Sequence, residues 1–222
     1  MEGWTAKNSY QKISPSNKKE LPLHHHSTKS GTGHDLNNDI MGLDMYFYKK
    51  TYVKNWSHFK PEYQTQVVTM TGGEVREDIK PERVSYIIEE IGYWRKFNAL
   101  HGFIVSNFAE QDDCKPIYLD ISNLEEIRKV LGEVLAILEK SKKIPKVENV
   151  SSDRVIEEII YDCKNEIEAI FPPTEGFFFG SQEINNWFKD NVEYSIDVIE
   201  NALKEYEEHP KVSMDFYYQA SW

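Results

Sequence analysis

Hydrophobic and polar positions alternate near both ends of the region that follows residue 40. The sequence "LDMYFY" begins this region, and its alternating apolar positions are Leu43, Met45 and Phe47. The sequence "MDFYYQ" lies near the end of the chain and repeats the pattern, with Met214 and Phe216 on one face. A period of two is typical of a strand that buries one face. We therefore expect strands at 43–48 and 214–220 to share one sheet, with these apolar residues inward.

Between these strands, apolar residues recur at spacings of three and four and predict about four helices. The expected ranges are 81–107, 122–140, 151–171 and 181–203. Pro81 suits a first helical turn, Ser122 opens a capping-box pattern, and Ser181 is a suitable N-cap. Short strands or turns are expected at "QTQVVTM", "KPIYLDI" and "EGFFFGS". The expected fold class is α+β, with a small, mainly antiparallel sheet of the N- and C-terminal strands packed against about four helices.

Residues 1–40 have a different composition. They are rich in Ser, Lys, Asn and Gly and show neither a helical nor a strand period. Such a segment cannot bury enough apolar surface to fold, so it is expected to be a disordered N-terminal extension. Three adjacent histidines within it, from His24 to His26, do not define a coordination geometry, and no metal site is predicted. Residues 41–222 are expected to form a single α+β domain.

The charge of the chain narrows the classes of partner. The 222 residues carry a formal net charge of −11, which disfavours direct binding to nucleic-acid phosphates and to anionic membranes. No apolar run approaches 18 residues, so no membrane span is expected. The two cysteines, Cys114 and Cys163, do not suggest a disulfide scaffold, and a reducing compartment such as the cytoplasm is expected.

The stretch "EEIGYWRKFNALHGFIV" contains polar residues among large apolar ones. On a helical wheel, Trp94, Asn98 and His101 fall in one apolar stripe, and Arg95 lies on its rim. An unsatisfied buried polar group costs about 1–3 kcal/mol, so these groups need partners. One interpretation is a buried hydrogen-bond network with the C-terminal strand or with residues 176–181. The other is a pocket in which Trp94 stacks on a ligand and Arg95 pairs with its charge.

A second group of candidate residues lies on the opposite face of the terminal strands. Asp44, Tyr46, Asp215 and Tyr217 alternate with the apolar positions and should share one outer face. Tyrosine suits a solvated face because its ring packs while its hydroxyl stays in water. Clustered tyrosines also provide contact area at low entropic cost, so this face is a candidate surface for a ligand or a partner.

Four sequence blocks occur in an order that resembles a family of small proteins common in bacteriophage and prophage genomes. The blocks are "MGLDMY", "EIGYWRKFNALHGFIV", "PPTEGFFFGS" and "FYYQASW". The resemblance covers about residues 41–222, although Lys142 to about Ile170 is an expansion relative to the family and the segment before Met41 departs from it. It implies a phage-associated intracellular context and transfers no catalytic residues.

No motif in the chain specifies a reaction. The sequence lacks a phosphate-binding loop, a zinc-ligand spacing and a nucleophile elbow, so no catalytic residue and no cofactor are predicted. The first functional hypothesis is a binding protein that interacts without catalysis with a host or phage macromolecule. The alternative is a protein, with or without enzymatic activity, that binds a small anionic or nucleotide-like ligand around Arg95, Asn98 and His101.

Overall fold

A computed structural model describes residues 42–151, 154–176 and 179–222. All of these residues belong to one compact unit of the chain. The predicted N-terminal extension, residues 1–40, lies outside the described residues. The part of the chain that the structure describes has the α+β fold expected from the sequence, with strands and helices that mix along the chain.

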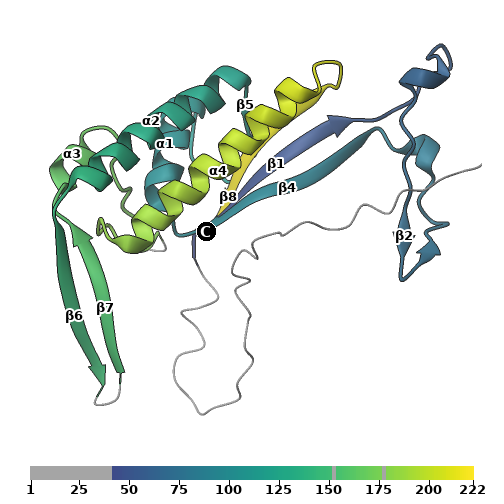
Figure 1. The fold of residues 1–222 in the computed structure, drawn as a ribbon. Coiled ribbons are helices and arrows are strands. Elements are labelled where there is room, and N and C mark those ends of the chain that lie inside the picture. The colour runs from purple at the N-terminus through teal and green to yellow at the C-terminus, as the bar shows by residue number, and fades with distance from the viewer. Residues whose placement is uncertain (1–41, 152–153, 177–178) are drawn as a thin grey trace, which may run out of the picture. The chain divides into compact units, whose positions relative to one another are not determined.

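The central element is a four-stranded sheet with the strand order β4-β1-β8-β5. Its strands are β1 (Asp44–Tyr52), β4 (Tyr86–Arg95), β5 (Ile117–Leu119) and β8 (Met214–Ser221). All three neighbouring pairs are antiparallel. The N-terminal and C-terminal strands therefore lie side by side at the centre of the sheet, as the shared sequence pattern predicted (Figure 1).

The register of the two central strands confirms the predicted faces. Met45, Phe47 and Phe216 are each at most 1% exposed, and the rings of Phe47 and Phe216 stack with centroids 5.9 Å apart. Met214 is partly buried against the same core. The residues of the opposite face keep part of their surface in contact with solvent; these include Asp44, Tyr46, Asp215 and Tyr217.

Four helices of the described residues accompany the sheet. They are α1 (Asn98–Phe108), α2 (Ile121–Lys140), α3 (Lys164–Glu168) and α4 (Asn186–Glu208). The long helices α2 and α4 pack against each other and cover the inner face of the sheet (Figure 1). Two caps differ from the expected ones: Asp120 caps α2 through a capping box with Asn123, and Asn185 caps α4. Each helix therefore begins at a residue other than the predicted one.

The predicted helix at 81–107 is wrong over most of its length. Pro81 begins a short 3-10 turn, Tyr86–Arg95 is strand β4, and only Asn98–Phe108 is helical. The strand segment is rich in β-branched and aromatic residues, which favour a pleated conformation when a partner strand is present. Strand β1 is that partner along the whole length of β4. Lys96, with a φ of 62°, separates the strand from the helix.

The predicted helix at 151–171 is also wrong. The chain there forms a hairpin of β6 (Lys143–Ser151) and β7 (Arg154–Tyr161), followed by the single-turn helix α3. Its apolar residues are again mostly valine and isoleucine, which fit a strand. A smaller hairpin, β2 (Met70–Thr71) and β3 (Glu74–Val75), confirms the turn expected at Gly72 and Gly73, both of which have positive φ.

Candidate functional site

The strand register brings seven tyrosines to the outer face of the sheet, the face opposite to α2 and α4. We call this surface the tyrosine face; its tyrosines are Tyr46, Tyr48, Tyr52, Tyr86, Tyr93, Tyr118 and Tyr217. Directly opposite residues of paired strands point to the same side, and the pairs Tyr46–Tyr93, Tyr52–Tyr86 and Tyr48–Tyr217 all link these residues. The two tyrosines predicted from the terminal strands are thus part of a larger set that spans all four strands.

Ring contacts order these side chains. Tyr46 stacks on Tyr48 with centroids 6.0 Å apart, and it also meets Tyr93 at 5.3 Å. Tyr118 and Tyr217 form an edge-to-face pair at 5.6 Å. These separations fall within the range in which aromatic pairs attract each other. The face is therefore a preordered aromatic surface, and its residues lose little conformational entropy when a partner binds.

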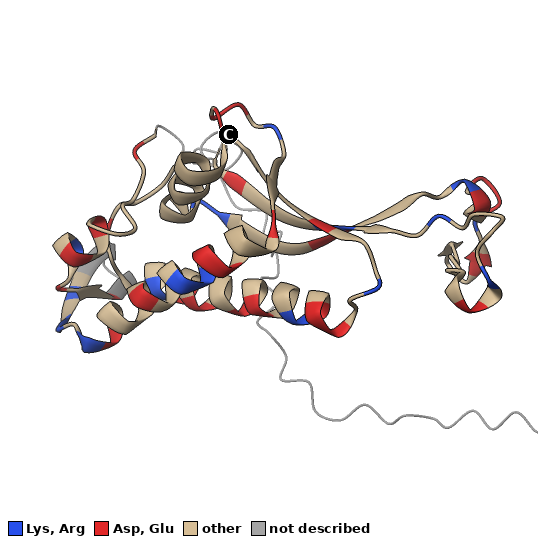
Figure 2. Cartoon of the chain, turned by 90° about the horizontal axis from the view of Figure 1, so that it is seen from above, with Lys and Arg blue, Asp and Glu red and all other residues tan. Residues whose placement is uncertain are grey.

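Charged residues of both signs border the tyrosines. Asp44, Glu90 and Asp215 are balanced in part by Lys50 and Arg95, and Lys50 lies over the ring of Tyr86. Figure 2 shows acidic positions along the helices, whereas the strands of the sheet are mostly uncharged. Most of the net charge of −11 therefore lies away from the tyrosine face.

The hydroxyl groups of Tyr46 and Tyr93 remain protonated at neutral pH. The Tyr93 hydroxyl donates a hydrogen bond to Asp44 Oδ1 over 2.5 Å. Partial burial and the Asp44 carboxylate together raise the pKa of Tyr93 to about 12. Burial, followed by the charges of Asp44 and Glu90, also raises the pKa of Tyr46. Both hydroxyls are therefore neutral groups that can donate and accept hydrogen bonds.

The structure does not support the pocket roles that the helical wheel suggested for Trp94 and Arg95, namely stacking on a ligand and pairing with its charge. Successive residues of a strand point to opposite faces. Trp94 points inward, is 3% exposed, and donates a hydrogen bond from Nε1 to Ser195 Oγ over 2.9 Å. Arg95 is exposed and opposite Asp44 in the register of β1 and β4, so it belongs to the tyrosine face. Neither side chain forms the wall of a pocket with Asn98 and His101.

Asn98 is buried and bonded to backbone, as expected. Its Nδ2 group donates to the carbonyl oxygens of Phe179 and Ser181 over 2.9 and 3.0 Å. Its Oδ1 atom accepts a hydrogen bond from the Thr174 backbone N–H over 3.2 Å. One side chain thus connects helix α1 to the chain between α3 and α4. This is the buried hydrogen-bond network that the sequence allowed; it uses both amide hydrogens of Asn98, whose side chain is only 3% exposed.

His101 is also buried, with 1% of its surface exposed, and both ring nitrogens are occupied. Nδ1 lies 2.8 Å from the Tyr218 hydroxyl, and Nε2 lies 3.2 Å from Asp112 Oδ2. Burial lowers the pKa of His101, and Asp112 opposes this shift. A neutral ring that donates from Nε2 to Asp112 and accepts from Tyr218 satisfies every group. Sequence reasoning did not identify this contact, because Asp112 lies in the loop after α1 and carries no pattern that links it to His101.

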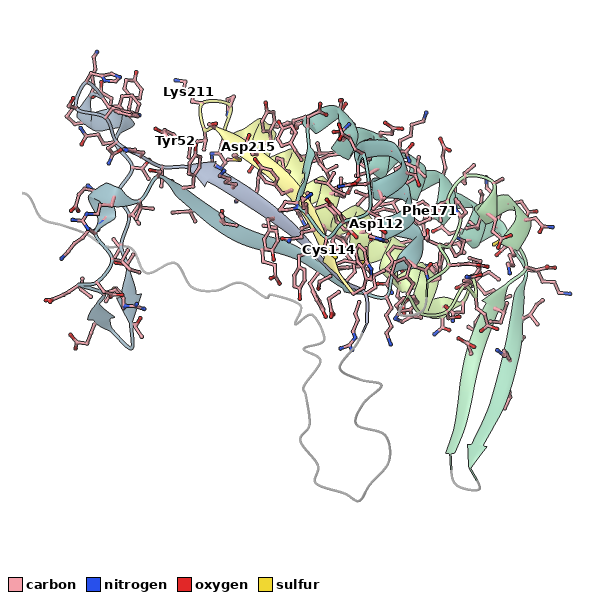
Figure 3. All side chains as sticks on the ribbon, turned by 180° about the vertical axis from the view of Figure 1, so that it is seen from behind. Tyr52, Asp112, Cys114, Phe171, Lys211 and Asp215 are labelled. Atoms are coloured by element: carbon pink, nitrogen blue, oxygen red, sulfur yellow. The ribbon has the colours of Figure 1, made fainter. Side chains whose placement is uncertain are left out.

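The space around this network is too small for a ligand. A cavity of about 10 Å³ adjoins His101 and is lined by Asp112, Cys114, Tyr218 and Trp222, among others. This volume holds about one water molecule. Asp112 and Cys114 lie in the loop between α1 and β5 (Figure 3). Two larger open hollows, of about 340 and 330 Å³, both reach Tyr118 at the border of the tyrosine face.

Two further properties concern the described residues as a set. Their His, Cys, Asp and Glu side chains form no group of three or more that could hold a metal ion. Their helices include none that is both long and apolar enough to cross a membrane.

No protein-family model, curated protein or solved structure matches the chain. The functional interpretation therefore rests on the residues of the tyrosine face and of the buried network.

Proposed function

We propose that the protein binds another protein through its tyrosine face and acts without catalysis. The observation that carries this proposal is the set of seven tyrosines on one side of the sheet, with ring contacts that fix their positions. A folded domain does not need such a surface for its own core, because α2 and α4 already cover the inner face. Tyrosine gives a large contact area and a neutral hydroxyl at low entropic cost, which is why binding surfaces are rich in it.

The charges around the face favour a protein partner over a nucleic acid. A nucleic-acid site needs several cations for phosphates, whereas Lys50 and Arg95 here are offset by Asp44, Glu90 and Asp215. The acidic remainder of the chain would also repel a phosphate backbone. A partner with mixed polar and apolar groups matches the face better.

Binding of a small anionic ligand around Arg95, Asn98 and His101 has weaker support. Asn98 and His101 are buried and engaged in internal hydrogen bonds, and Arg95 lies on the other face of the sheet. We therefore favour the binding protein. The resemblance to phage proteins adds the proposal that the partner is a host or phage protein in the cytoplasm of a bacterial host.

The proposal can be tested by substitution of matched aromatic residues. Tyr93 and Tyr118 on the tyrosine face are 40% and 53% exposed, and Trp187 on α4 and Tyr63 in a turn are 38% and 61% exposed. Tagged wild-type protein, the double variant Tyr93→Ala/Tyr118→Ala and the control Trp187→Ala/Tyr63→Ala are used to capture proteins from infected and uninfected bacterial lysates. Quantitative mass spectrometry compares the three captures, and thermal melting verifies that all variants fold.

We expect the double variant at the tyrosine face to lose at least about 90% of a partner that the control retains, since aromatic residues at the centre of an interface often contribute 2 kcal/mol or more. Retention of every specific partner by a folded Tyr93→Ala/Tyr118→Ala protein would refute the proposal. The same captures are analysed for small molecules, and a ligand lost only in His101→Ala would favour the alternative.

A further inference from the structure

Strand β4 forms an open edge of the sheet. It pairs with β1 on one side, and among the described residues no strand lies on its other side. The opposite edge, β5, is only three residues long and follows Lys115 and Pro116 directly, two residue types that prevent edge pairing. Strand β4 has ten residues and contains neither lysine nor proline. Lysine and proline are thus present at one edge and missing at the other, where the charged residues are Glu89, Glu90 and Arg95.

The open edge is also apolar where it is most exposed. Ile88 is 64% exposed, Tyr86 is 46% exposed, and Ile87 is 38% exposed. Three adjacent large apolar residues on an unpaired strand form a template for another strand, because the backbone supplies hydrogen bonds and the side chains supply burial. Strand β1 is paired with a strand at each of its edges, and its residues are much less exposed.

Backbone hydrogen bonds show which groups of β4 face outward. The Val53 N–H donates to the Ser85 carbonyl over 3.0 Å, so Ser85 faces β1. Alternation along an antiparallel strand then directs the N–H and C=O groups of Tyr86, Ile88 and Glu90 away from β1. A register irregularity follows Glu90, and beyond it the Tyr93 N–H is covered by the Tyr194 hydroxyl at 3.4 Å. The pairing edge therefore ends near Glu90.

We infer that this edge pairs with the same edge of a second copy of the chain, antiparallel and about a two-fold axis at Ile88. In this register Tyr86 is opposite Glu90 of the partner, and Ile87 is opposite Glu89 of the partner. A register centred on Glu89 or Glu90 would place like charges directly opposite each other, which is unfavourable. Charge thus excludes the axes at Glu89 and Glu90, and a two-fold symmetric pair needs only the one self-complementary edge.

The pairing gives the molecule a single sheet of eight strands. The tyrosine faces of the two copies then lie on the same side and continue into each other through Tyr86, which is next to the edge. Because each copy carries a net charge of −11, repulsion opposes the dimer and added salt should strengthen it. The inference concerns the edge of the sheet and holds whether or not the tyrosine face binds a protein.

Disulfide cross-linking tests the axis. A hydrogen-bonded antiparallel pair has Cα atoms about 5.5 Å apart, within the range that a disulfide spans. In full-length protein with Cys114→Ser, the variant Ile88→Cys should form a covalent dimer with oxidised glutathione. The matched control Glu90→Cys lies on the same edge, but its two copies would be about 13 Å apart in this register, which a disulfide cannot bridge.

Sedimentation equilibrium supplies the second measurement. Wild-type protein should be a dimer at 100 µM in about 0.15 M salt, and Ile88→Lys should weaken the dimer at least about tenfold because it places two cations on the axis. Its melting temperature at a concentration where both proteins are monomeric should be unchanged, since the Ile88 side chain is exposed in one copy. A monomeric wild type at this concentration would overturn the inference. Equal cross-linking of Ile88→Cys and Glu90→Cys, or a dimer that resists Ile88→Lys, would overturn it as well.

Discussion

Acidification should destabilise the protein through His101. The imidazole is buried, and burial lowers its pKa in the folded state below the value of about 6.5 that it has in an unfolded chain. Below pH 6.5 the unfolded state therefore binds more protons than the folded state. The free energy of unfolding therefore does not depend on this histidine above about pH 6.5, and it decreases as the pH falls below that value.

The structure sets an upper limit on the loss. At pH 5.5 an unfolded histidine is about ten times more often protonated than neutral, so a ring that stays neutral in the fold costs about 1.4 kcal/mol of stability. Asp112 lies 3.2 Å from Nε2 and raises the pKa of His101, which makes the real loss smaller. We expect His101 to lower the free energy of unfolding by about 0.5 to 1.4 kcal/mol between pH 7.5 and pH 5.5.

Urea denaturation at pH 7.5 and pH 5.5 measures this loss. Other titrating groups contribute too, so the comparison is made with His101→Gln, which retains polar groups but does not titrate near neutral pH. Both proteins are measured at one concentration, in case they associate. Wild-type protein should lose more stability on acidification than His101→Gln. An equal loss in the two proteins would refute the claim that the buried network holds His101 in its neutral form.

Two further predictions concern the core. Phe216→Ala should lower the free energy of unfolding, measured by urea denaturation, by about 3–5 kcal/mol, because the ring is 1% exposed and stacks on Phe47. Tyr217→Ala on the outer face should lower it by less than about 1.5 kcal/mol. Comparable losses in the two variants would mean that the assigned faces are wrong. Asn98→Ala should lower the free energy of unfolding by at least about 2 kcal/mol, because it leaves backbone groups of Thr174, Phe179 and Ser181 without their partner. Asn107→Ala, at the exposed end of the same helix, should lower it by less than about 1 kcal/mol.

The terminal strands could be predicted from the sequence because each has one face in the core. Their period of two was visible at Met45 and Phe47 and again at Phe216, and the structure pairs the two strands along almost their whole length. The burial of Asn98 and His101 was also predicted correctly. Its basis was a helix that proved to start only at Asn98, and the residues that follow do have the helical period assumed.

The remaining elements depend on partners that the sequence does not reveal. The segments 86–95 and 154–161 carry apolar residues at spacings compatible with a helix, but each has a partner strand that stabilises the extended form. This error placed Arg95 beside Asn98, although the strand directs Arg95 to the tyrosine face. Most of the seven tyrosines on that face were not identified as candidate residues, because strand order and register bring them together only in three dimensions.

Site-specific photo-cross-linking in the bacterial host tests the tyrosine face most directly. A photoreactive phenylalanine analogue replaces Tyr93 in one protein, Tyr118 in a second and Trp187 on α4 in a third; Tyr93 and Trp187 are almost equally exposed, at 40% and 38%. If the tyrosine face binds a protein, the positions of Tyr93 and Tyr118 should give covalent adducts with the same partner, and that of Trp187 should give none. Adducts from the Trp187 position alone, or equal adducts from all three positions, would contradict the proposed binding surface.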